Sequence, residues 1–407
     1  MALVVAWEGA LGRVMIALAL TTALVLPRVA GAWSFIPIPE FITDPDEGNT
    51  FGLMGVFLFL NERDEIQYML APDIRYNKTK GVFPTFRLFG YPTPERRYSI
   101  ALGKSTTRDE NYEFEFSDRS FWEGRAFVLA NLTYERDSTE RFYGFGNDSP
   151  ESGESNYTGA NFDTLVTPGV WLLPVMNLAY TMGIQRFAVQ PGQVDAVPFI
   201  LTAHPEVQER GGEPAVYWTH NVAFTYDSRD SRDIPSRGAF ATTYFELADQ
   251  RLGSPTSFVK FGFEWRDFIP LPIRRGSPIL ALRALADYVS GDKDTPFWQL
   301  SALGGRRSLR GFGGDRFIDF NRSLASAEVR TRIWQRRLFG VNAELELAPF
   351  VETGQVFRRV TDSPVNDLHW SYGIGFRGVV RPQIVAIVDV GAGSEGTAVF
   401  TGVGYPF

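Results

Sequence analysis

The chain has 407 residues, a net charge of −7, 14% aromatic residues, 39 glycines and no cysteine. The acidic balance argues against a nucleic-acid partner, and a chain without cysteine must hold its fold without disulfides. This length can hold two or three soluble domains. However, many glycines and aromatic residues without a long apolar run are typical of short strands joined by turns. We therefore expect one large all-β unit.

The N-terminal residues 1–32 are predicted to form a secretory signal peptide. Arg13 precedes the apolar run 14–26, and the small residues Ala30-Gly31-Ala32 then provide a cleavage site. The apolar run is shorter than the roughly 20 residues that a membrane-spanning helix needs. The alternative is an anchor helix or a buried helix. An exported chain of this composition is either soluble in the periplasm or spans the bacterial outer membrane as a barrel.

Residues 33–48 hold three prolines and four acidic residues. This composition suits an extended periplasmic lead-in segment more than a folded domain. Such a lead-in leaves no room for a separate periplasmic module before the first strand. We expect the membrane-spanning barrel to occupy residues 49–407.

Alternation of apolar and polar residues predicts the strands of this barrel. In residues 259–266, one face carries Val, Phe and Trp and the other carries Lys, Gly, Glu and Arg; residues 326–333 and 341–347 repeat the alternation. One face of a spanning strand meets lipid and the other meets the barrel interior. A soluble sandwich also alternates. Aromatic pairs at segment ends, such as Phe121-Trp122 and Tyr217-Trp218, favour the interfacial girdles of a membrane barrel.

About 17 runs of strand-like residues follow one another along the chain. They lie near 51–60, 65–76, 82–89, 97–105, 111–117, 122–135, 157–172, 176–189, 215–227, 239–248, 257–268, 279–289, 324–335, 340–352, 369–379, 383–391 and 397–407. A single-chain outer-membrane barrel needs an even number of strands. We expect a transmembrane antiparallel β-barrel of 16 strands, with one misassigned run within residues 51–135. Short turns are expected in the periplasm and long loops outside.

Catalytic motifs are not found in the sequence. Of the three histidines, His220 falls on the apolar face of its predicted strand, which favours a lipid-facing side chain over a hydrolase base; His204 lies in a long loop and His369 at a strand start. The chain has no G-x-S-x-G or H-E-x-x-H motif. We therefore predict no catalytic residues, no metal site and no cofactor.

A glycine-rich basic stretch, Gly304 to Gly314, lies in the long connection 290–323 and contains Leu309-Arg310-Gly311-Phe312. It does not have the strand and helix context of a phosphate-binding loop. The predicted interior faces of the following strands carry Glu328, Glu344, Glu346 and Glu352. A loop folded back into the barrel would set its guanidinium groups against these carboxylates, to which the planar fork of arginine is suited. The alternative is a solvated basic loop outside the barrel.

Several motifs together resemble the BamA/TamA-type outer-membrane barrels of the bacterial surface antigen family. Ser308-Leu309-Arg310-Gly311-Phe312 resembles the plug-loop motif of that family, and its companions follow in order along residues 140–407. These companions are Phe142-Tyr143-Gly144-Phe145-Gly146-Asn147, Asp227-Ser228-Arg229-Asp230 with Pro235-Ser236-Arg237-Gly238, Ser326-Ala327-Glu328-Val329-Arg330, and Phe350-Val351-Glu352-Thr353-Gly354. Gly402, Tyr405 and the terminal Phe407 resemble the C-terminal assembly signal, although Phe400 replaces its usual polar start.

The resemblance implies a 16-stranded barrel whose long extracellular loop enters the lumen, with Arg310 bonded to Glu352 first and Glu328 second. Glu352 stands where the family motif has aspartate, so the side chain is one methylene longer. The resemblance also implies a role in inserting or translocating protein or lipid at the outer membrane.

The partners implied are outer-membrane lipid, the barrel assembly machinery during biogenesis, and a separate periplasmic protein. The last follows because the periplasmic polypeptide-transport (POTRA) domains of larger members are missing from this sequence. Two other functions stay open: a passive pore or structural surface barrel, and an outer-membrane hydrolase that would rest on His220 and the carboxylates.

Overall fold

The computed structural model describes residues 33–61, 66–338, 341–381 and 384–407. The predicted signal peptide, residues 1–32, lies outside the described residues. Most of the described chain is β-strand. In these segments, no helix has the length and apolar character needed to cross a membrane.

The strands follow one another with few interruptions. They are β1 (Trp33–Asp44), β2 (Gly48–Leu60), β3 (Ile66–Leu70), β4 (Asp73–Asn77), β5 (Gly81–Thr93), β6 (Arg96–Lys104), β7 (Glu110–Ser120), β8 (Ala126–Phe142), β9 (Ser155–Leu173), β10 (Met176–Pro191), β11 (Ala215–Asp227), β12 (Gly238–Ala248), β13 (Phe258–Pro270), β14 (Ile279–Gly291), β15 (Ser301–Leu303), β16 (Phe317–Asp319), β17 (Asn321–Leu338), β18 (Val341–Phe357), β19 (His369–Val380), β20 (Ile384–Gly393) and β21 (Gly396–Val403). Short helical turns lie between them: α2 (Phe121–Gly124), α3 (Ile200–Ala203), η1 (Glu151–Gly153), η2 (Pro205–Arg210), η3 (Gln250–Leu252) and η4 (Phe297–Gln299).

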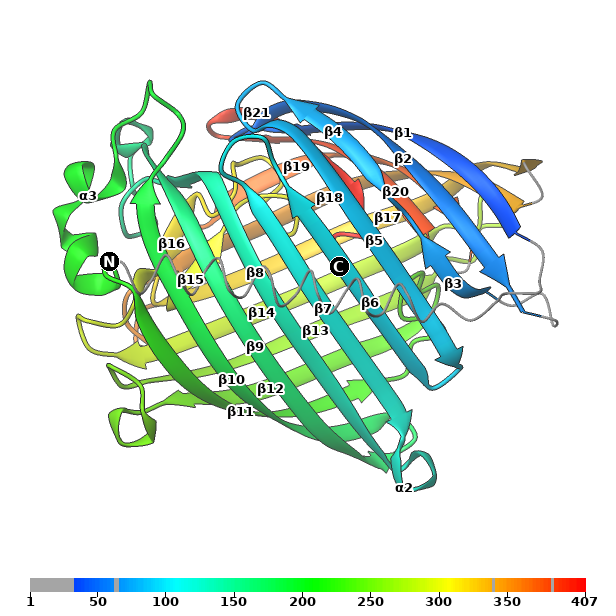
Figure 1. Ribbon diagram of the computed structural model, residues 1–407, viewed down its shortest axis with the longest axis horizontal. Coiled ribbons are helices and arrows are strands. Elements are labelled where there is room, and N and C mark those ends of the chain that lie inside the picture. Colours follow the sequence, from blue (N-terminus) through cyan, green and yellow to red (C-terminus); the bar gives the residue numbers. More distant parts are fainter. Residues whose placement is uncertain (1–32, 62–65, 339–340, 382–383) are drawn as a thin grey trace.

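Nineteen of these strands form one antiparallel sheet, in which each strand pairs with its neighbours along the chain. The sheet curls into a barrel (Figure 1). β15 and β16 form a separate two-stranded sheet within the β14–β17 connection, so β14 pairs directly with β17. β1 and β21 lie side by side, and the Thr43 amide donates to the Thr401 hydroxyl at 3.3 Å. We call this β1–β21 junction the seam.

The expected 16 strands differ from the observed pairing. β3 and β4 both pair with β2 and β5, so they are two halves of one interrupted strand, which leaves 18 strand positions in the described sheet. All of the predicted runs coincide with strands. The strand that was overlooked is β1, which lies in the supposed lead-in and pairs with β2 along its whole length.

Two prolines give β1 the composition of a lead-in segment although it is a strand. Pro37 and Pro39 lack amide donors. Because the two residues are two positions apart, their backbone nitrogens point to the same edge of the strand. The other edge keeps its full set of donors for a neighbouring strand. Proline is tolerated in a strand when one edge is spared in this way.

The faces of the strands differ in exposure. On β13, Phe261 and Phe263 are exposed while Lys260 and Glu264 are partly covered, and on β17 Ile333 is exposed while Glu328 and Arg330 are buried. We call the face that bears Glu328 the enclosed face. Because a barrel strand alternates between lipid and interior, the exposed apolar face suits a lipid environment.

The four longest connections, 143–154, 192–214, 292–320 and 358–368, all lie at the same end of the barrel because consecutive strands are antiparallel. Three of them pack together through an apolar cluster. Its buried members are Phe142, Tyr157, Ile200, Val207, Phe297 and Ile318. This cap covers the end of the barrel next to the glycine-rich stretch.

Candidate functional site

The glycine-rich loop, residues 304–316, is a compact turn whose backbone bonds to itself. The Gly305 amide donates to the Phe312 carbonyl at 3.1 Å, and the Phe312 amide donates to the Leu309 carbonyl at 3.0 Å. Leu309 has a φ of 50°, a left-handed conformation that is costly for a residue with a side chain. Leu309 and Phe312 are buried in an apolar cluster with residues of β14, β15, β17 and β18, which holds this turn in place.

Arg310 lies between these two apolar anchors and is completely buried. Its backbone amide donates to Glu352 Oε2 at 2.7 Å and its Nε donates to Glu352 Oε1 at 3.1 Å, while Nη1 donates to Glu328 Oε2 at 2.9 Å. The guanidinium also lies over the Phe350 ring, 3.5 Å from its centroid. Glu352 thus reaches Arg310 directly, with glutamate in place of the aspartate of the family motif.

The charges around Arg310 continue onto β19 and β20. Asp389 Oδ2 lies 3.4 Å from Arg310 Nη1, and Arg377 donates to both Asp389 Oδ1 at 2.7 Å and Glu328 Oε2 at 3.1 Å. Arg330 Nε donates to Glu328 Oε1 at 2.9 Å. We call these six side chains the Arg310 cluster; three are cationic and three anionic, and all are buried.

Charge balance has a clear consequence for Arg310. Burial opposes its charged form, but the neighbouring carboxylates of Glu352, Glu328 and Asp389 outweigh that effect and raise the pKa of the guanidinium. Arg310 therefore stays charged. A charged group that is fully buried must keep all its partners, since loss of one leaves an uncompensated charge.

Sequence reasoning missed Arg377 and Asp389. A signal was present: each is the only charged residue in the interior of an otherwise apolar strand, and the two strands are neighbours. Opposite charges isolated in this way on adjacent strands predict a buried pair.

The glycines of the loop allow it to touch β20. A Cβ added to Gly311 would lie 2.6 Å from the carbonyl carbon of Ala392, and one added to Gly391 would lie 2.0 Å from the Arg310 carbonyl oxygen. Both contacts are with backbone atoms, which cannot move aside as a flexible side chain can. Glycine is required on both sides of this approach.

The end of the loop reaches both sides of the seam. The Gly314 amide donates to Asp46 Oδ2 at 2.8 Å in the β1–β2 turn. Arg316, which is buried, forms an ion pair with Glu395 at 2.7 Å in the β20–β21 turn and donates to the Ser149 carbonyl at 2.7 Å. The loop therefore connects the turns of the two strand pairs that flank the seam.

Other predicted residues lie elsewhere. Glu344 and Glu346 are buried on β18 but contact neither Arg310 nor Arg316; Glu346 accepts from the Tyr405 hydroxyl at 2.7 Å. Gly402, on β21, lies against the Arg306 side chain.

The chain turns inward after β21, because Gly404 has a φ of 84°. Tyr405 and Phe407 therefore lie beyond the strand, whereas a terminal strand was expected to include them. Arg330 stacks on Tyr405, and its Nη2 donates to the Phe407 carbonyl at 3.0 Å.

The three histidines are not brought together. His220 Nδ1 lies 2.7 Å from the Tyr180 hydroxyl, on the face that also exposes Val222. His204 Nε2 lies 2.7 Å from the Gly153 carbonyl, and His369 stacks on Phe317 at 3.9 Å. Each one thus has a packing or hydrogen-bonding role at its own site.

Known proteins resemble this architecture. A profile of the Omp85 superfamily domain matches residues 96–379. The outer membrane protein assembly factor BamA of Nitratidesulfovibrio vulgaris is 25% identical over 199 residues, which is 41% of this chain and only 24% of that protein's length.

Two solved structures share the fold. BamA from Haemophilus ducreyi lacking POTRA domains 1–3 has a TM-score of 0.57 at 14% identity and covers 91% of this chain and 75% of its own. CdiB from Escherichia coli has a TM-score of 0.58 at 13% identity, and the match covers 90% of this chain and 66% of the CdiB chain. The profile spans well over half of the chain, including β6 to β19 and the loop with its partners on β17 and β18. The chain therefore belongs to the Omp85 superfamily of outer-membrane β-barrels.

Proposed function

We propose that this protein aids the insertion or translocation of protein or lipid at the bacterial outer membrane, with the glycine-rich loop as a lumen plug. Barrels of this superfamily are generally transport and assembly proteins rather than enzymes. The BamA relative carries the description of an outer membrane protein assembly factor. Outer-membrane lipid, the assembly machinery and a separate periplasmic protein are the partners that this role would involve.

One observation carries the proposal: a single loop bonds to the β17–β20 wall and also to the turns on both sides of the seam. The Arg310 cluster fixes the loop to the wall, while Gly314 and Arg316 reach Asp46 and Glu395. At the seam itself, β1 and β21 lie side by side and the Thr43 amide donates to the Thr401 hydroxyl, but the strand pairings of the described residues do not include one between them. A seam supported by a loop can open when the loop moves, without loss of the remaining strand pairs.

Opening would expose unpaired strand edges at which a client strand could add by pairing. The hydrogen bonds of the other strand pairs would hold the rest of the barrel. Such a mechanism needs no catalytic group, only a junction weaker than its neighbours.

The test is a reversible disulfide across the seam. Because the chain has no cysteine, Thr43→Cys with Thr401→Cys introduces the sole thiol pair. We expect the oxidised protein to assemble normally but to lose its effect on outer-membrane protein and lipid composition, and a reductant to restore it. Each single cysteine variant is the control. Full activity of the oxidised double variant would refute seam opening, and unchanged membrane composition after deletion of the gene would refute the assembly role.

A further inference from the structure

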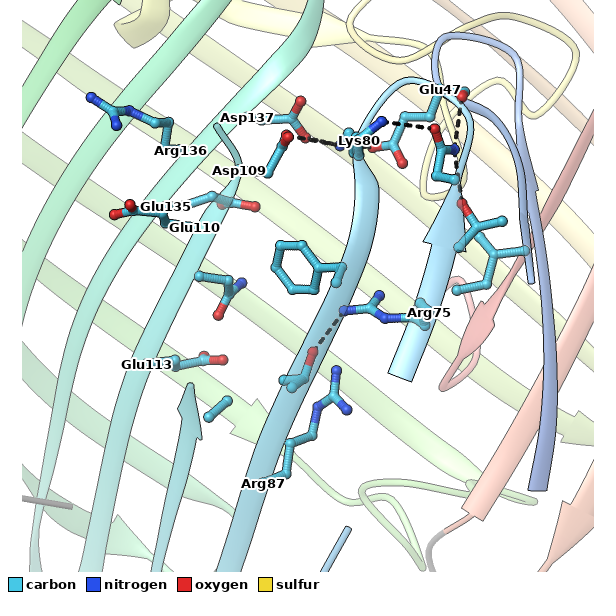
Figure 2. A pocket seen from close by; sticks show the side chains of 17 residues that line it. Glu47, Arg75, Lys80, Arg87, Asp109, Glu110, Glu113, Glu135, Arg136 and Asp137 are labelled. Carbon is cyan, nitrogen blue, oxygen red and sulfur yellow. Dashed lines mark hydrogen bonds and ion pairs between the residues drawn. The ribbon is translucent and has the colours of Figure 1, made fainter. Parts of the chain in front are cut away.

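The neighbouring strands β7 and β8 carry different charges on their two faces. On the enclosed face, Glu113 of β7 and both Glu135 and Asp137 of β8 line a cavity (Figure 2). Residues of β4, β5 and β6 also line this cavity, and we call the β4–β8 region of the interior the open half. The outward face of the same part of the barrel, from β6 to β10, carries cationic side chains.

Contacts inside the barrel show which residues of β10 point outward. Gln299, in the β14–β17 connection, bonds to Gln185 on β10 at 2.6 Å and also to Lys260 on β13. Gln185 therefore faces the interior, and Arg186, the next residue, points outward. Arg186 pairs in register with an aromatic row on the outward face of β7, β8 and β9. The row consists of Tyr112, Tyr134 and Phe162.

Two further cationic side chains lie on this outward face. Arg136 is two residues beyond Tyr134 on β8, and Lys104 is two residues beyond Leu102, which packs against the aromatic row. Side chains two residues apart on a strand share a face. Figure 2 shows the Arg136 guanidinium directed away from Asp137, whose carboxylate turns toward Lys80 inside the barrel.

One carboxylate, Glu110 on β7, lies among these cations. It pairs in register with Lys104 on one side and with Arg136 on the other, and Lys104 Nζ donates to it at 2.6 Å. Three cationic groups thus stand against a single anionic one. We call Lys104, Glu110, Arg136 and Arg186 the outer basic patch.

Small residues of β9 and β10 let the two arginines of the patch share one area of the surface. Arg136 Nη2 on β8 donates to Gln190 on β10 at 3.4 Å, so its side chain crosses β9. Ala160 of β9, which pairs with both Arg136 and Ala188, is buried beneath it although it faces outward. Strands lie about 4.8 Å apart, so the backbones of β8 and β10 are about 10 Å apart here.

The cations of the patch lie at one depth in the membrane. Long loops of outer-membrane barrels are outside, so the end with the short turns is the periplasmic end. Counted from that end, Lys104 is the ninth residue of β6, and Arg136 and Arg186 are the eleventh residues of β8 and β10. A tilted strand crosses the hydrocarbon core with about 9–11 residues. The patch therefore emerges where the outer leaflet has its headgroups.

Strands elsewhere in the barrel present aromatic side chains at this depth. By the same count, Trp218 and Phe261 are the tenth residues of β11 and β13, and Trp370 is the eleventh residue of β19. Phe261 and Trp370 are exposed on the outward face. Aromatic residues are usual at this boundary. The positive charge is thus a local feature of the β6–β10 sector, on a chain whose net charge is −7.

We propose that the outer basic patch binds the phosphate groups of a phosphorylated glycolipid of the lipid A type in the outer leaflet. The planar guanidinium group pairs with phosphate through two hydrogen bonds, and basic side chains at a membrane surface attract anionic headgroups. This inference gives a site to the outer-membrane lipid partner of the proposed function. It requires the location in the outer membrane but not the assembly role.

Binding of purified lipid A tests the patch. Native mass spectrometry of the purified barrel in detergent micelles counts the lipid A molecules bound at each lipid concentration. We expect the triple variant Lys104→Gln, Arg136→Gln, Arg186→Gln to bind about 100-fold more weakly than the wild type. Equal affinity of the triple variant and the wild type would overturn the proposal.

A second triple variant controls for the loss of charge. Lys293→Gln with Arg274→Gln and Arg275→Gln removes one lysine and two arginines from exposed connections outside the patch. It should bind lipid A as the wild type does and keep the same heat-modifiable mobility. A loss of affinity as large as that of the patch variant would show that total charge, and not the patch, holds the lipid.

Glu110→Gln should act in the opposite direction. Removal of the only carboxylate of the patch should tighten binding of lipid A about fivefold, a result that a damaged fold does not produce. Unchanged or weaker binding would contradict the electrostatic assignment.

The choice of lipid tests the ligand class. Lipid A without its phosphate groups should bind the wild type and the patch variant equally weakly. Phosphatidylglycerol that binds as tightly as lipid A would overturn the assignment to a glycolipid. These measurements use the barrel without a client, so their failure and a failure of the assembly role are distinguishable.

Discussion

The two halves of the barrel interior carry similar side chains in opposite states. In the β17–β20 half, arginines and carboxylates pair at full burial because the glycine-rich loop fills the space. In the β4–β8 half, Glu115, Glu135 and Arg97 remain exposed on the enclosed face, so no part of the described chain covers them. A charged side chain on the enclosed face can therefore be either a buried ion-pair partner or a hydrated group. Which of the two it is depends on whether the glycine-rich loop covers it.

This difference in burial determines how much stability is lost when a charged side chain is removed from each half. A charge that has lost its water depends on its partners, so removal of one partner costs several kcal/mol. A hydrated charge keeps water as an alternative partner, so its loss changes stability little. The substitutions below test this contrast, from the largest expected effect to the smallest.

The largest effect is expected for Arg310→Ala, which leaves Glu352 and Glu328 buried without that partner. The free energy of unfolding should fall by about 3–5 kcal/mol, measured as a lower temperature for the loss of heat-modifiable mobility. Arg307→Ala is the matched control, because Arg307 is exposed and only its carbonyl oxygen bonds to Arg283. Wild-type stability of Arg310→Ala would mean that the loop is held by its apolar anchors alone.

Gly311→Ala is expected to come next. The new methyl group would collide with the backbone of β20, and overpacking of this kind costs about 1–3 kcal/mol. Gly378→Ala serves as the comparison because its nearest neighbour would be the Ala386 Cβ at 3.9 Å. Denaturant unfolding in detergent micelles measures both. Equal stability of the two variants would show that the loop does not press against β20.

Glu395→Gln should have a smaller effect, because Glu395 is partly exposed and Arg316 keeps its bonds to Ser149. Loss of a hydrogen bond between charged groups costs about 1.5–3 kcal/mol at full strength, and partial exposure reduces this. We expect faster hydrogen exchange in β1 and β21 with unchanged exchange in β17 and β18. Faster exchange spread over all four strands would instead indicate general destabilisation.

The smallest effect on stability is expected for Glu113→Gln in the open half. Glu113 faces the cavity, and the change should alter the free energy of unfolding by less than about 1 kcal/mol. The same thermal measurement used for Arg310→Ala checks it. A loss as large as that of Arg310→Ala would erase the contrast between the two halves.

Much of this fold was accessible from the sequence, because period-two alternation marks a strand whatever its partners. The predicted runs all became strands, including the interrupted pair β3 and β4. β1 was missed because proline lowers strand propensity, while its pairing with β2 depends on which edge the prolines spare. That information lies in the partner strand and not in the local sequence.

The candidate site was predicted only in part, because the local sequence does not show which strands lie together. The motif identified Arg310 and the face bearing Glu328 and Glu352, but Arg377 and Asp389 lie on strands that local patterns treat as apolar. The open half was not predicted at all, since Arg87 and Glu113 meet only through the register of β5, β6 and β7.

The order of the Arg310 cluster along the chain bears on biogenesis. Arg310 precedes Glu328, Glu352, Arg377 and Asp389 along the chain, and 268 residues separate Asp46 from Gly314. The loop therefore cannot reach its final state until the last strands have arrived, and these distant contacts form late. Burial of Arg310 thus marks completion of the barrel wall, so that a chain truncated before β20 would hold its loop through β17 and β18 without Asp389.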